Sequence, residues 1–373
     1  MVSARRVFRS IALLISLSSC AGFLLAGAPS TPVQRRERRA GGVVAAHGEL
    51  RASIIGIGAA APARRVPNSE LEKVVDTSDE WISQRTGISC RHLIAPDQGL
   101  ADLASKAAKE ALEHAGVDPL EVGLVIMATS SPDDLFGDAA FVARSVGATN
   151  AVAFDLTAAC SGFLFGINTA SQFLHNGAYK TAIVIGADAL SRWVDWTDRN
   201  TCVLFGDGAG AAILKHRPGA RGLLTTCLGS DGSKASLLEL PGGGSACPAT
   251  AESVADRRHF LRMDGKETFK NAVQAMVSAS NEVLERCGLS IEQIRCVIPH
   301  QANQRILSAV GERLGATAEQ VFVNVDRYGN TSAASVGIAM DEAVREGRIQ
   351  PGDLVLLVVF GAGLTWGAAI VEF

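Results

Sequence analysis

Apolar residues form two kinds of segment from residue 51 onward. Short unbroken apolar runs predict buried strands at 53–58, 122–128, 151–156 and 296–298. Elsewhere apolar residues recur every three or four positions, which predicts amphipathic helices at 100–115, 161–174, 267–287 and 305–314. Glycines stand just beyond three of these helices, at Gly116, Gly177 and Gly288, where a left-handed residue commonly ends a helix. Strands that alternate with helices in this way are typical of an α/β fold.

The pattern of the first half of the chain returns in the second half. Residues 115–126 align with residues 287–298 at an offset of 172, and residues 154–167 align with 325–338 at an offset of 171. Such order and spacing indicate an internal duplication, although unrelated α/β units can share patterns of this kind. Duplication predicts an N-terminal half at 49–219, a C-terminal half at 220–373, and a site between them.

The first 48 residues differ in composition from everything that follows. Arginines at positions 5, 6 and 9 precede an apolar stretch at 11–25 and the small residues 26–28, an order typical of a secretory signal. Residues 31–48 are basic and poor in acids, as in a transit peptide. Together they predict a bipartite leader that directs the protein to the chloroplast stroma of a plastid bounded by extra membranes. Plain secretion is one alternative. A membrane-spanning helix is another, but the apolar stretch is short for a full span and is interrupted by serines.

Charge and cysteine content narrow the class of partner. Residues 1–48 hold seven arginines and one acid, whereas the remainder holds 28 basic and 37 acidic residues, a net charge of −9. Such a surface is unsuited to nucleic acid or anionic membrane, so an acidic partner would need a local basic patch. The eight cysteines show no C-x-x-C or other metal-binding spacing, and seven of them lie outside the leader. This odd, scattered set argues against a disulfide framework and for a reducing compartment.

Cys160 lies at the turn between the predicted strand 151–156 and the predicted helix 161–174. Unpaired backbone N–H groups and the positive end of the helix dipole favour a thiolate there, and the thiolate is the nucleophilic form. The alternative is an inert buried thiol, as most free cysteines are. This position alone does not decide between the two.

Two further polar residues follow strand ends in the second half. His300 comes directly after the strand 296–298, which Pro299 ends, and a strand end that leads into a helix is a usual place for ligand sites in open α/β sheets. A single histidine is nevertheless more often structural. Asn330 precedes a helix predicted from Ala333, where by itself it is most simply a helix cap.

Taken together, these motifs resemble the β-ketoacyl-acyl-carrier-protein synthase III family. The motifs are TAACSGF (157–163), PHQAN (299–303), YGNTSAA (328–334) and FGAGLTWG (360–367), with DEWISQRTGI (79–88) and FGDGAG (205–210). The resemblance runs from about Ser53 to Phe373, and SPDDLFG (131–137) is closer to the plastid and cyanobacterial branch. It implies a thiolase-like, five-layer αβαβα fold built from two duplicated halves, in a homodimer.

The resemblance also implies an activity and a Cys-His-Asn triad, which falls on Cys160, His300 and Asn330. The activity is the decarboxylating condensation of acetyl-CoA with malonyl-acyl carrier protein (malonyl-ACP) to acetoacetyl-ACP, CO2 and CoA. Cys160 would hold the acetyl group, and the backbone N–H groups of Cys160 and Ala362 would form an oxyanion hole. His300 and Asn330 would stabilise the enolate left by decarboxylation. An asparagine as the third residue of the triad separates this chain from elongating synthases, which use Cys-His-His. No metal, nucleotide or redox cofactor is implied.

The resemblance also implies which residues contact each substrate. The residues that would contact CoA are Thr77, Trp81, Arg85, Arg199 and Asn303, with Trp81 and Arg199 stacked on the adenine. Those with acyl carrier protein are Lys270, Arg305 and Arg313, whereas Glu312 departs from the family's basic patch. A residue near Leu135 or Phe136 would cross the dimer and set the primer size. Alternatively, Trp81 is a residue of the hydrophobic core, and the arginines are exposed to solvent without binding a substrate.

Other functions stay open at this point. A related condensing enzyme could use a longer acyl primer or make a secondary metabolite, and a non-catalytic scaffold could keep the same fold. The loss of a triad residue would mark such a scaffold, and all three triad residues are present here.

Overall fold

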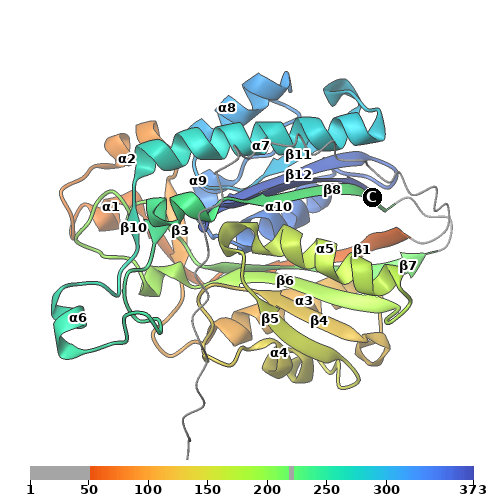
Figure 1. The fold of residues 1–373 in the computed structure, drawn as a ribbon, viewed down its shortest axis with the longest axis horizontal. Helices are drawn as coiled ribbons and strands as arrows, with labels where there is room; N and C mark the ends of the chain where they lie inside the picture. The colour runs from red at the N-terminus through yellow and green to blue at the C-terminus, as the bar shows by residue number, and fades with distance from the viewer. Residues whose placement is uncertain (1–50, 218–221) are drawn as a thin grey trace, which may run out of the picture. The chain divides into compact units, whose positions relative to one another are not determined.

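Two large β-sheets and three layers of helices form the framework of the computed structural model, which describes residues 51–217 and 222–373 (Figure 1). The first sheet has the order β1-β7-β6-β4-β5, with bounds Arg51–Ala60, Gly208–Arg217, Thr181–Asp188, Leu124–Ala128 and Val152–Leu156. The second has the order β11-β12-β13-β8, with bounds Cys296–Pro299, Leu354–Gly361, Thr365–Glu372 and Leu223–Ser230. The leader predicted at residues 1–48 lies outside the described residues.

Helices cover both outer faces of the sheets and fill the space between them (Figure 1). On the outer side of the first sheet lie α3 (Leu100–Ala115) and α4 (Ala139–Ser145), and on that of the second lie α7 (Gly265–Cys287) and α8 (Gln304–Leu314). The central layer is α5 (Gly162–His175) and α10 (Ala334–Arg345), which contact strands of both sheets. This arrangement confirms the predicted five-layer αβαβα fold.

The two sheets share one topology, as the predicted duplication requires. In the first sheet β1 and β7 pair antiparallel, as do β7 and β6, while β6, β4 and β5 are mutually parallel. The second sheet repeats this with β8, β13, β12 and β11, and a parallel bridge between Val297 and Val321 takes the place of a fifth strand. The boundaries of the halves stay a prediction, because the junction near residue 220 falls in the undescribed residues 218–221.

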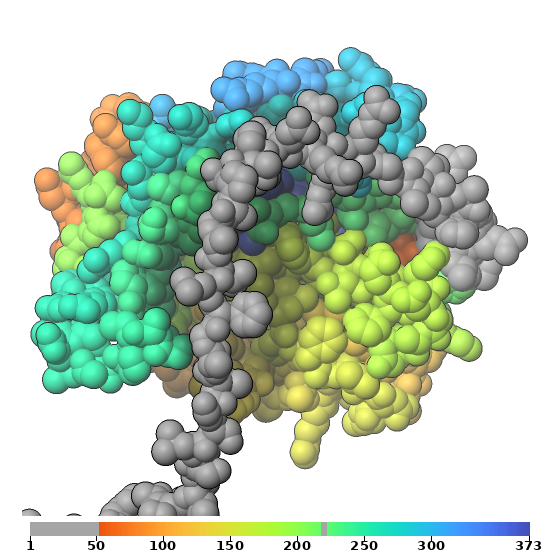
Figure 2. Space-filling view, in the orientation of Figure 1, coloured from red at the N-terminus to blue at the C-terminus, as the bar shows by residue number. Residues whose placement is uncertain are grey.

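Smaller elements surround this framework. The short strand pairs are β2 (Arg64–Pro67) with β3 (Cys90–Leu93), and β9 (Leu238–Glu239) with β10 (Arg262–Met263). The remaining helices are α1 (Asn68–Leu71), α2 (Asp79–Thr86), α6 (Ala251–Ala255) and α9 (Val325–Tyr328). The 3-10 turns are η1 (Pro119–Glu121), η2 (Ala159–Ser161), η3 (Leu190–Arg192), η4 (Gly232–Leu237) and η5 (Ile291–Gln293). Most residues of α6 are exposed, and it lies on the surface in the space-filling view (Figure 2).

The strongly periodic helices have the bounds that their sequences predict. Helix α3 spans the expected residues 100–115, and α7 extends its predicted range by two residues at the N-terminus. Gly116 and Gly288 follow these helices with φ of +60° and +64°, a conformation in which a side chain would be strained. Local signals therefore determine where these helices end.

Paired glycines let the central layer approach the first sheet closely. A Cβ placed on Gly210 of β7 would lie 2.6 Å from the Cα of Gly337 on α10, closer than real carbon atoms approach. Helix α10 therefore packs directly on the strand backbone. Buried side chains such as Ile126, Phe163 and Val359 then join the central helices to both sheets.

One strand differs from its prediction. The apolar run 151–156 predicts a buried strand, but β5 lies at the edge of its sheet and none of its residues is buried. Val152 is 52% exposed. The apolar pattern is thus present without the expected burial, because β5 pairs only with β4 among the described strands.

No helix in residues 51–217 and 222–373 is long and apolar enough to cross a membrane.

Candidate active site

A cavity of about 220 Å³ brings Cys160, His300 and Asn330 together. Cys160 follows β5 of the first half, His300 follows β11, and Asn330 lies between α9 and α10. All three are at most 7% exposed and line the same cavity. The predicted triad therefore meets where strand ends of the two halves face each other.

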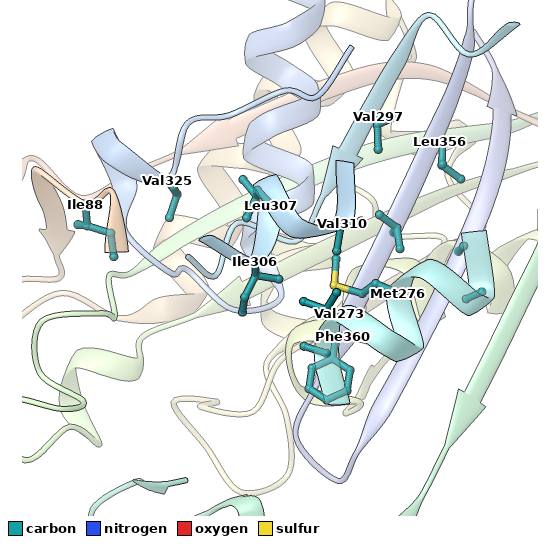
Figure 3. Close-up of a cluster of buried hydrophobic side chains, with 14 of the residues drawn as sticks. Ile88, Val273, Met276, Val297, Ile306, Leu307, Val310, Val325, Leu356 and Phe360 are labelled. Carbon is teal, nitrogen blue, oxygen red and sulfur yellow. The ribbon is translucent and has the colours of Figure 1, made fainter. Parts of the chain in front are cut away.

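Apolar side chains of the second half form one wall of the cavity. Met276 of α7, Ile306 of α8 and Phe360 of β12 line it and also belong to a buried hydrophobic cluster. Figure 3 shows Phe360 and Met276 close to Val273 within this cluster. A largely apolar cavity that holds a few polar groups is typical of a small-molecule site.

Cys160 lies in η2, the short turn directly before α5. Burial raises the pKa of Cys160 to about 12; the negative charge of Asp188 adds to this, and hydrogen bonds from Ser332 and from its own backbone N–H oppose it. Burial thus opposes the thiolate that the helix N-terminus is predicted to favour, and the thiolate stays a prediction. The preceding residue, Ala159, has a φ of +48°, unusual for a non-glycine residue.

Sequence reasoning missed Ser332, which contacts the nucleophile candidate directly. Its hydroxyl oxygen lies 3.3 Å from Sγ of Cys160, 172 positions away in the chain. Ser332 also has a positive φ, +51°. Strain in non-glycine residues concentrates at functional sites, and here two strained residues, Ala159 and Ser332, stand beside one sulfur.

Asp188, at the end of β6, is a second missed residue. Its carboxylate is fully buried and accepts hydrogen bonds at Oδ1 from Ser130 N (2.8 Å), Ser131 Oγ (2.8 Å) and Thr129 Oγ1 (3.2 Å). Its Oδ2 accepts from Ala333 N at 3.2 Å. Burial raises the pKa of Asp188, which these hydrogen bonds oppose.

His300 is a neutral base held by one hydrogen bond. Burial lowers the pKa of His300 to about 4. Its Nδ1 lies 2.6 Å from the Ser335 hydroxyl oxygen, so Nε2 is the ring nitrogen left for a ligand in the cavity. An uncharged imidazole can donate a hydrogen bond to a ligand oxygen without carrying a charge into the buried cavity.

Asn330 is not a helix cap, because the N-cap of α10 is Ala333. Oδ1 of Asn330 instead accepts the backbone N–H of Ser332 at 2.9 Å. This hydrogen bond identifies the amide oxygen, so the NH2 group of Asn330 is the end available to donate into the cavity.

Gln301, inside the PHQAN motif, ties the histidine segment to the asparagine segment. Its Nε2 donates to the carbonyls of Pro299 and Phe322 at 2.8 and 3.1 Å. Its Oε1 accepts from the backbone N–H groups of Asn324 and Val325 at 2.9 and 3.2 Å. The buried amide therefore fixes the strand end before His300 against the chain that leads to Asn330.

The turn between β12 and β13 passes against the nucleophile candidate. A Cβ on Gly361 would lie 2.8 Å from the backbone nitrogen of Cys160, so only glycine fits there. The Thr365 hydroxyl donates to the Ala158 carbonyl at 2.8 Å, and Ser161 Oγ donates to the Thr365 carbonyl at 3.2 Å. These bonds hold the turn that contains Ala362 beside Cys160, where the oxyanion hole is predicted.

The residues predicted to contact CoA gather around Trp81, near the cavity. The guanidinium carbons of Arg85 and Arg199 lie 4.4 and 5.0 Å from the Trp81 ring centroid. Trp81, Arg85 and Asn303 line the cavity. The hydroxyl oxygen of Thr77 is buried without a hydrogen-bond partner among the described residues.

Asn303 also has a structural task, since it caps α8. Its Oδ1 accepts from Arg305 N at 2.9 Å, and its Nδ2 donates to the Arg85 carbonyl at 3.2 Å. A role in binding CoA would therefore be additional to the cap.

The residues predicted to contact acyl carrier protein are exposed on two neighbouring helices. Lys270 lies on α7, and Arg305 and Arg313 lie on α8. Lys270 follows Phe269 in the chain and Arg305 precedes Ile306, and both of these neighbours line the cavity. Arg313 lies eight residues after Arg305, about 12 Å farther along the helix.

Comparison with known proteins places this geometry in a family. Residues 154–232 match the family described as 3-oxoacyl-acyl-carrier-protein synthase III, and residues 284–373 match its C-terminal part. The chain is 49% identical over 326 residues to β-ketoacyl-acyl-carrier-protein synthase III of Caldanaerobacter subterraneus, which covers 87% of this chain and 98% of that protein. It is 52% identical over 317 residues to the enzyme of the same name from Thermosynechococcus vestitus, covering 84% and 96%.

A solved structure agrees in fold. The crystal structure of 3-oxoacyl-acyl-carrier-protein synthase III from Aquifex aeolicus superposes with a TM-score of 0.80 at 44% identity. The match covers 86% of this chain and all of that one.

Proposed function

Because the chain belongs to the β-ketoacyl-acyl-carrier-protein synthase III family, we propose that it condenses acetyl-CoA with malonyl-ACP to start fatty acid synthesis. The observation that carries this proposal is the single cavity lined by Cys160, His300 and Asn330. Thiol, imidazole and amide groups are those that acyl transfer followed by decarboxylation requires.

In the first half-reaction Cys160 attacks the thioester carbonyl of acetyl-CoA and becomes acetylated. The backbone N–H groups of Cys160 and Ala362 stabilise the oxyanion, since the turn at Gly361 brings the two backbone segments together. CoA then leaves, and the acetyl group stays on sulfur for the second substrate.

In the second half-reaction His300 and Asn330 bind the thioester carbonyl of malonyl-ACP. Nε2–H of His300 and the NH2 group of Asn330 donate to that oxygen, which becomes an enolate as CO2 leaves. The orientations set by Ser335 and by Ser332 N leave these donors free for it. The enolate carbon attacks the acetyl group and regenerates Cys160. These steps use only side-chain and backbone groups, so the proposed reaction needs no cofactor.

Two surfaces receive the substrates. Trp81, Arg85 and Arg199 form a planar, cationic site suited to the adenine and phosphates of CoA, with Thr77 and Asn303 nearby. Lys270, Arg305 and Arg313 give exposed positive charge beside the cavity, which suits an acidic carrier protein.

The working form is a homodimer that pairs the exposed edge of β5 with its copy. Leu135 and Phe136, 90% and 94% exposed, lie near this edge beside a second hollow of about 510 Å³ that β5 also lines. Side chains this apolar are rarely left in water, so we place them at the interface, where one of them reaches the partner's site and sets primer length.

The site of action is the plastid. The basic leader at residues 1–48 and the similarity to a cyanobacterial enzyme support this location. A fluorescent protein fused to residues 1–48 should enter plastids, whereas secretion of the fusion would contradict the assignment.

Labelling with radioactive acyl-CoAs of increasing chain length tests the function. Acetyl-CoA should label Cys160, identified by peptide mapping, and malonyl-ACP should then release the label as acetoacetyl-ACP. Cys160→Ser should fold but lose labelling. Preferential labelling by longer chains would favour a different primer, and no labelling of the wild-type protein would favour a scaffold.

A further inference from the structure

Gln301 is a buried amide next to the proposed catalytic histidine, and the proposed reaction assigns it no task. It is 1% exposed and is not among the residues that line the cavity. Both ends of its amide group are hydrogen-bonded to backbone groups. A side chain that does not reach the substrate can affect the reaction only through the residues that it holds in place.

The amide of Gln301 joins two segments that carry different members of the triad. Its Nε2 donates to the carbonyl of Pro299, the residue directly before His300, at 2.8 Å. Its Oε1 accepts from the backbone N–H groups of Asn324 and Val325, at the start of α9, at 2.9 and 3.2 Å. One side chain thus spans from the end of β11 to the helix that leads to the asparagine.

His300 is held by bonds that do not involve the side chain of Gln301. Its backbone N–H donates to the carbonyl of Val358 on β12 at 2.8 Å. Its Nδ1 lies 2.6 Å from the hydroxyl oxygen of Ser335 on α10. The histidine is therefore a fixed reference, and α9 is the element that Gln301 aligns with it.

Asn330 depends on α9 for its position relative to the histidine. A single residue, Gly329, separates the helix from Asn330, so a shift of α9 reaches the asparagine directly. The backbone N–H of Asn330 donates to the Leu204 carbonyl at 2.8 Å, and its carbonyl accepts from Gly206 N at 3.0 Å. These bonds tie Asn330 to the segment between β6 and β7, and not to the strand that carries His300. Gln301 supplies the tie to that strand.

An amide is suited to this task because it carries donors and an acceptor at once. Here the donors face the carbonyls of Pro299 and Phe322, and the acceptor faces the first N–H groups of α9. A buried polar group whose partners are all in place favours one arrangement of the segments that it joins. That arrangement matters for catalysis, since a misplacement of about 1 Å can slow a reaction roughly 100-fold.

We propose that Gln301 is a positioning residue that keeps Asn330 and His300 at the separation at which both donate to one thioester oxygen. This role rests on the proposed function, in which that oxygen becomes the enolate of malonyl-ACP. Gln301 serves the second half-reaction, because acetylation of Cys160 uses the backbone N–H groups of Cys160 and Ala362 instead. It forms no bond to either substrate.

Separate single-turnover measurements of the two half-reactions test this role in Gln301→Met, which removes the four hydrogen bonds and keeps the length of the side chain. We expect decarboxylation of malonyl-ACP by the acetylated protein to be roughly 30-fold slower, and acetylation of Cys160 to change less than about threefold. Equal slowing of both steps would indicate general structural damage and would overturn the proposal. Unchanged decarboxylation would overturn it as well.

Gln320→Met is the matched control. The amide of Gln320 also binds backbone groups at both ends, donating to the carbonyls of Ile291 and Ile294 at 2.9 and 2.7 Å and accepting from Thr317 N at 2.9 Å. Gln320 does not line the cavity, so this variant should carry out both half-reactions at the wild-type rate. Selective loss of decarboxylation in Gln320→Met would remove the distinction on which the proposal depends.

A double-mutant cycle with Asn330→Ala shows whether Gln301 acts through the asparagine. If it does, Gln301→Met should slow decarboxylation less than about threefold once the Asn330 amide is absent, because there is then no donor left to misplace. If Gln301→Met slows decarboxylation by the same factor in both backgrounds, the two residues act independently and the proposal is wrong.

Thermal unfolding of each variant checks that it is folded. Should Gln301→Met fail to fold, Gln301→Glu replaces it in both tests. A glutamate keeps an acceptor oxygen for α9 but loses the amide donors to the strand end, so it should show the same selective loss and the same cycle. If wild-type protein takes no acetyl group at Cys160, or does not decarboxylate malonyl-ACP, the proposed function itself fails. Normal wild-type half-reactions with an unselective Gln301→Met would contradict the positioning role alone.

Discussion

Nδ1 of His300 lies 2.6 Å from the hydroxyl oxygen of Ser335, near the start of α10. The same oxygen accepts the backbone N–H of Gln301 at 3.4 Å. The Ser335 hydroxyl can therefore donate its own hydrogen to Nδ1, which leaves the proton of the neutral imidazole on Nε2. This is the tautomer that can donate a hydrogen bond to a thioester oxygen in the cavity.

Ser335→Ala should impair the second half-reaction more than the first. Without the hydroxyl, nothing selects the Nε2–H tautomer, and loss of a hydrogen bond worth about 1 kcal/mol should slow malonyl-ACP decarboxylation roughly fivefold to tenfold. Acetylation of Cys160 from acetyl-CoA should change little. Separate single-turnover measurements of the two steps check this, and slower acetylation with normal decarboxylation would mean that His300 serves the first step.

Burial of His300 should also make stability depend on pH. Its pKa is about 4 in the folded protein and 6.5 when exposed, so the unfolded chain binds more protons between these values. The free energy of unfolding therefore rises with pH across this window, and the contribution is lost as pH falls from 6.5 toward 4. The difference amounts to about 3 kcal/mol. Between pH 4 and pH 6.5, urea unfolding should show a steeper rise of the free energy of unfolding in wild type than in His300→Gln, and equal slopes would contradict this.

Sequence predicted the parts of the fold that local pattern controls. The bounds of α3 follow from its apolar spacing and from Gly116, and both are contained in one segment. The apolar run of β5 predicted a strand correctly, but burial depends on which neighbour pairs with it, and that is not a local property. Position along the chain could not show that β5 is an edge strand.

In the same way, some residues of the candidate site could be predicted from the sequence and others could not. Motifs identify Cys160, His300 and Asn330. Cys160 and His300 follow strands β5 and β11, whereas Asn330 follows the short helix α9 and not the strand end that was predicted. Ser332 and Asp188 contact the segments of Cys160 and Ala333, which lie 172 and 145 positions away, and neither contact has a sequence signature. Ser332 does lie within the YGNTSAA motif, so the motif marked its segment. The motif could not show that Ser332 contacts Cys160.

Arg199→Ala should weaken binding of acetyl-CoA without changing the chemical steps. The guanidinium lies 5.0 Å from the Trp81 ring centroid and donates to the Asp76 carbonyl at 2.9 Å, so it is held over the proposed adenine site. Loss of a cation–π contact of about 1 kcal/mol should raise KM for acetyl-CoA roughly fivefold to tenfold. Steady-state kinetics check this, with kcat and the KM for malonyl-ACP as internal references.

Arg295→Ala is the matched control, because Arg295 is exposed and its ion-pair partner among the described residues is Asp353, at 3.9 Å. It should leave all constants unchanged. An equal rise in both KM values for Arg199→Ala would indicate a general distortion of the site rather than a CoA contact.

Val152→Lys should convert the proposed dimer into monomers. Val152 is 52% exposed on β5, whose outer edge pairs with no described strand, and a lysine there disfavours edge-to-edge pairing because it brings two like charges together across the interface. Light scattering during gel filtration should give twice the chain mass for the wild-type protein and the single-chain mass for the variant. Val254→Lys makes the same change at a 49% exposed position on α6 and should remain dimeric. A Val152→Lys variant that stays dimeric would move the interface away from β5, and Leu135 and Phe136 would then need another explanation for their exposure.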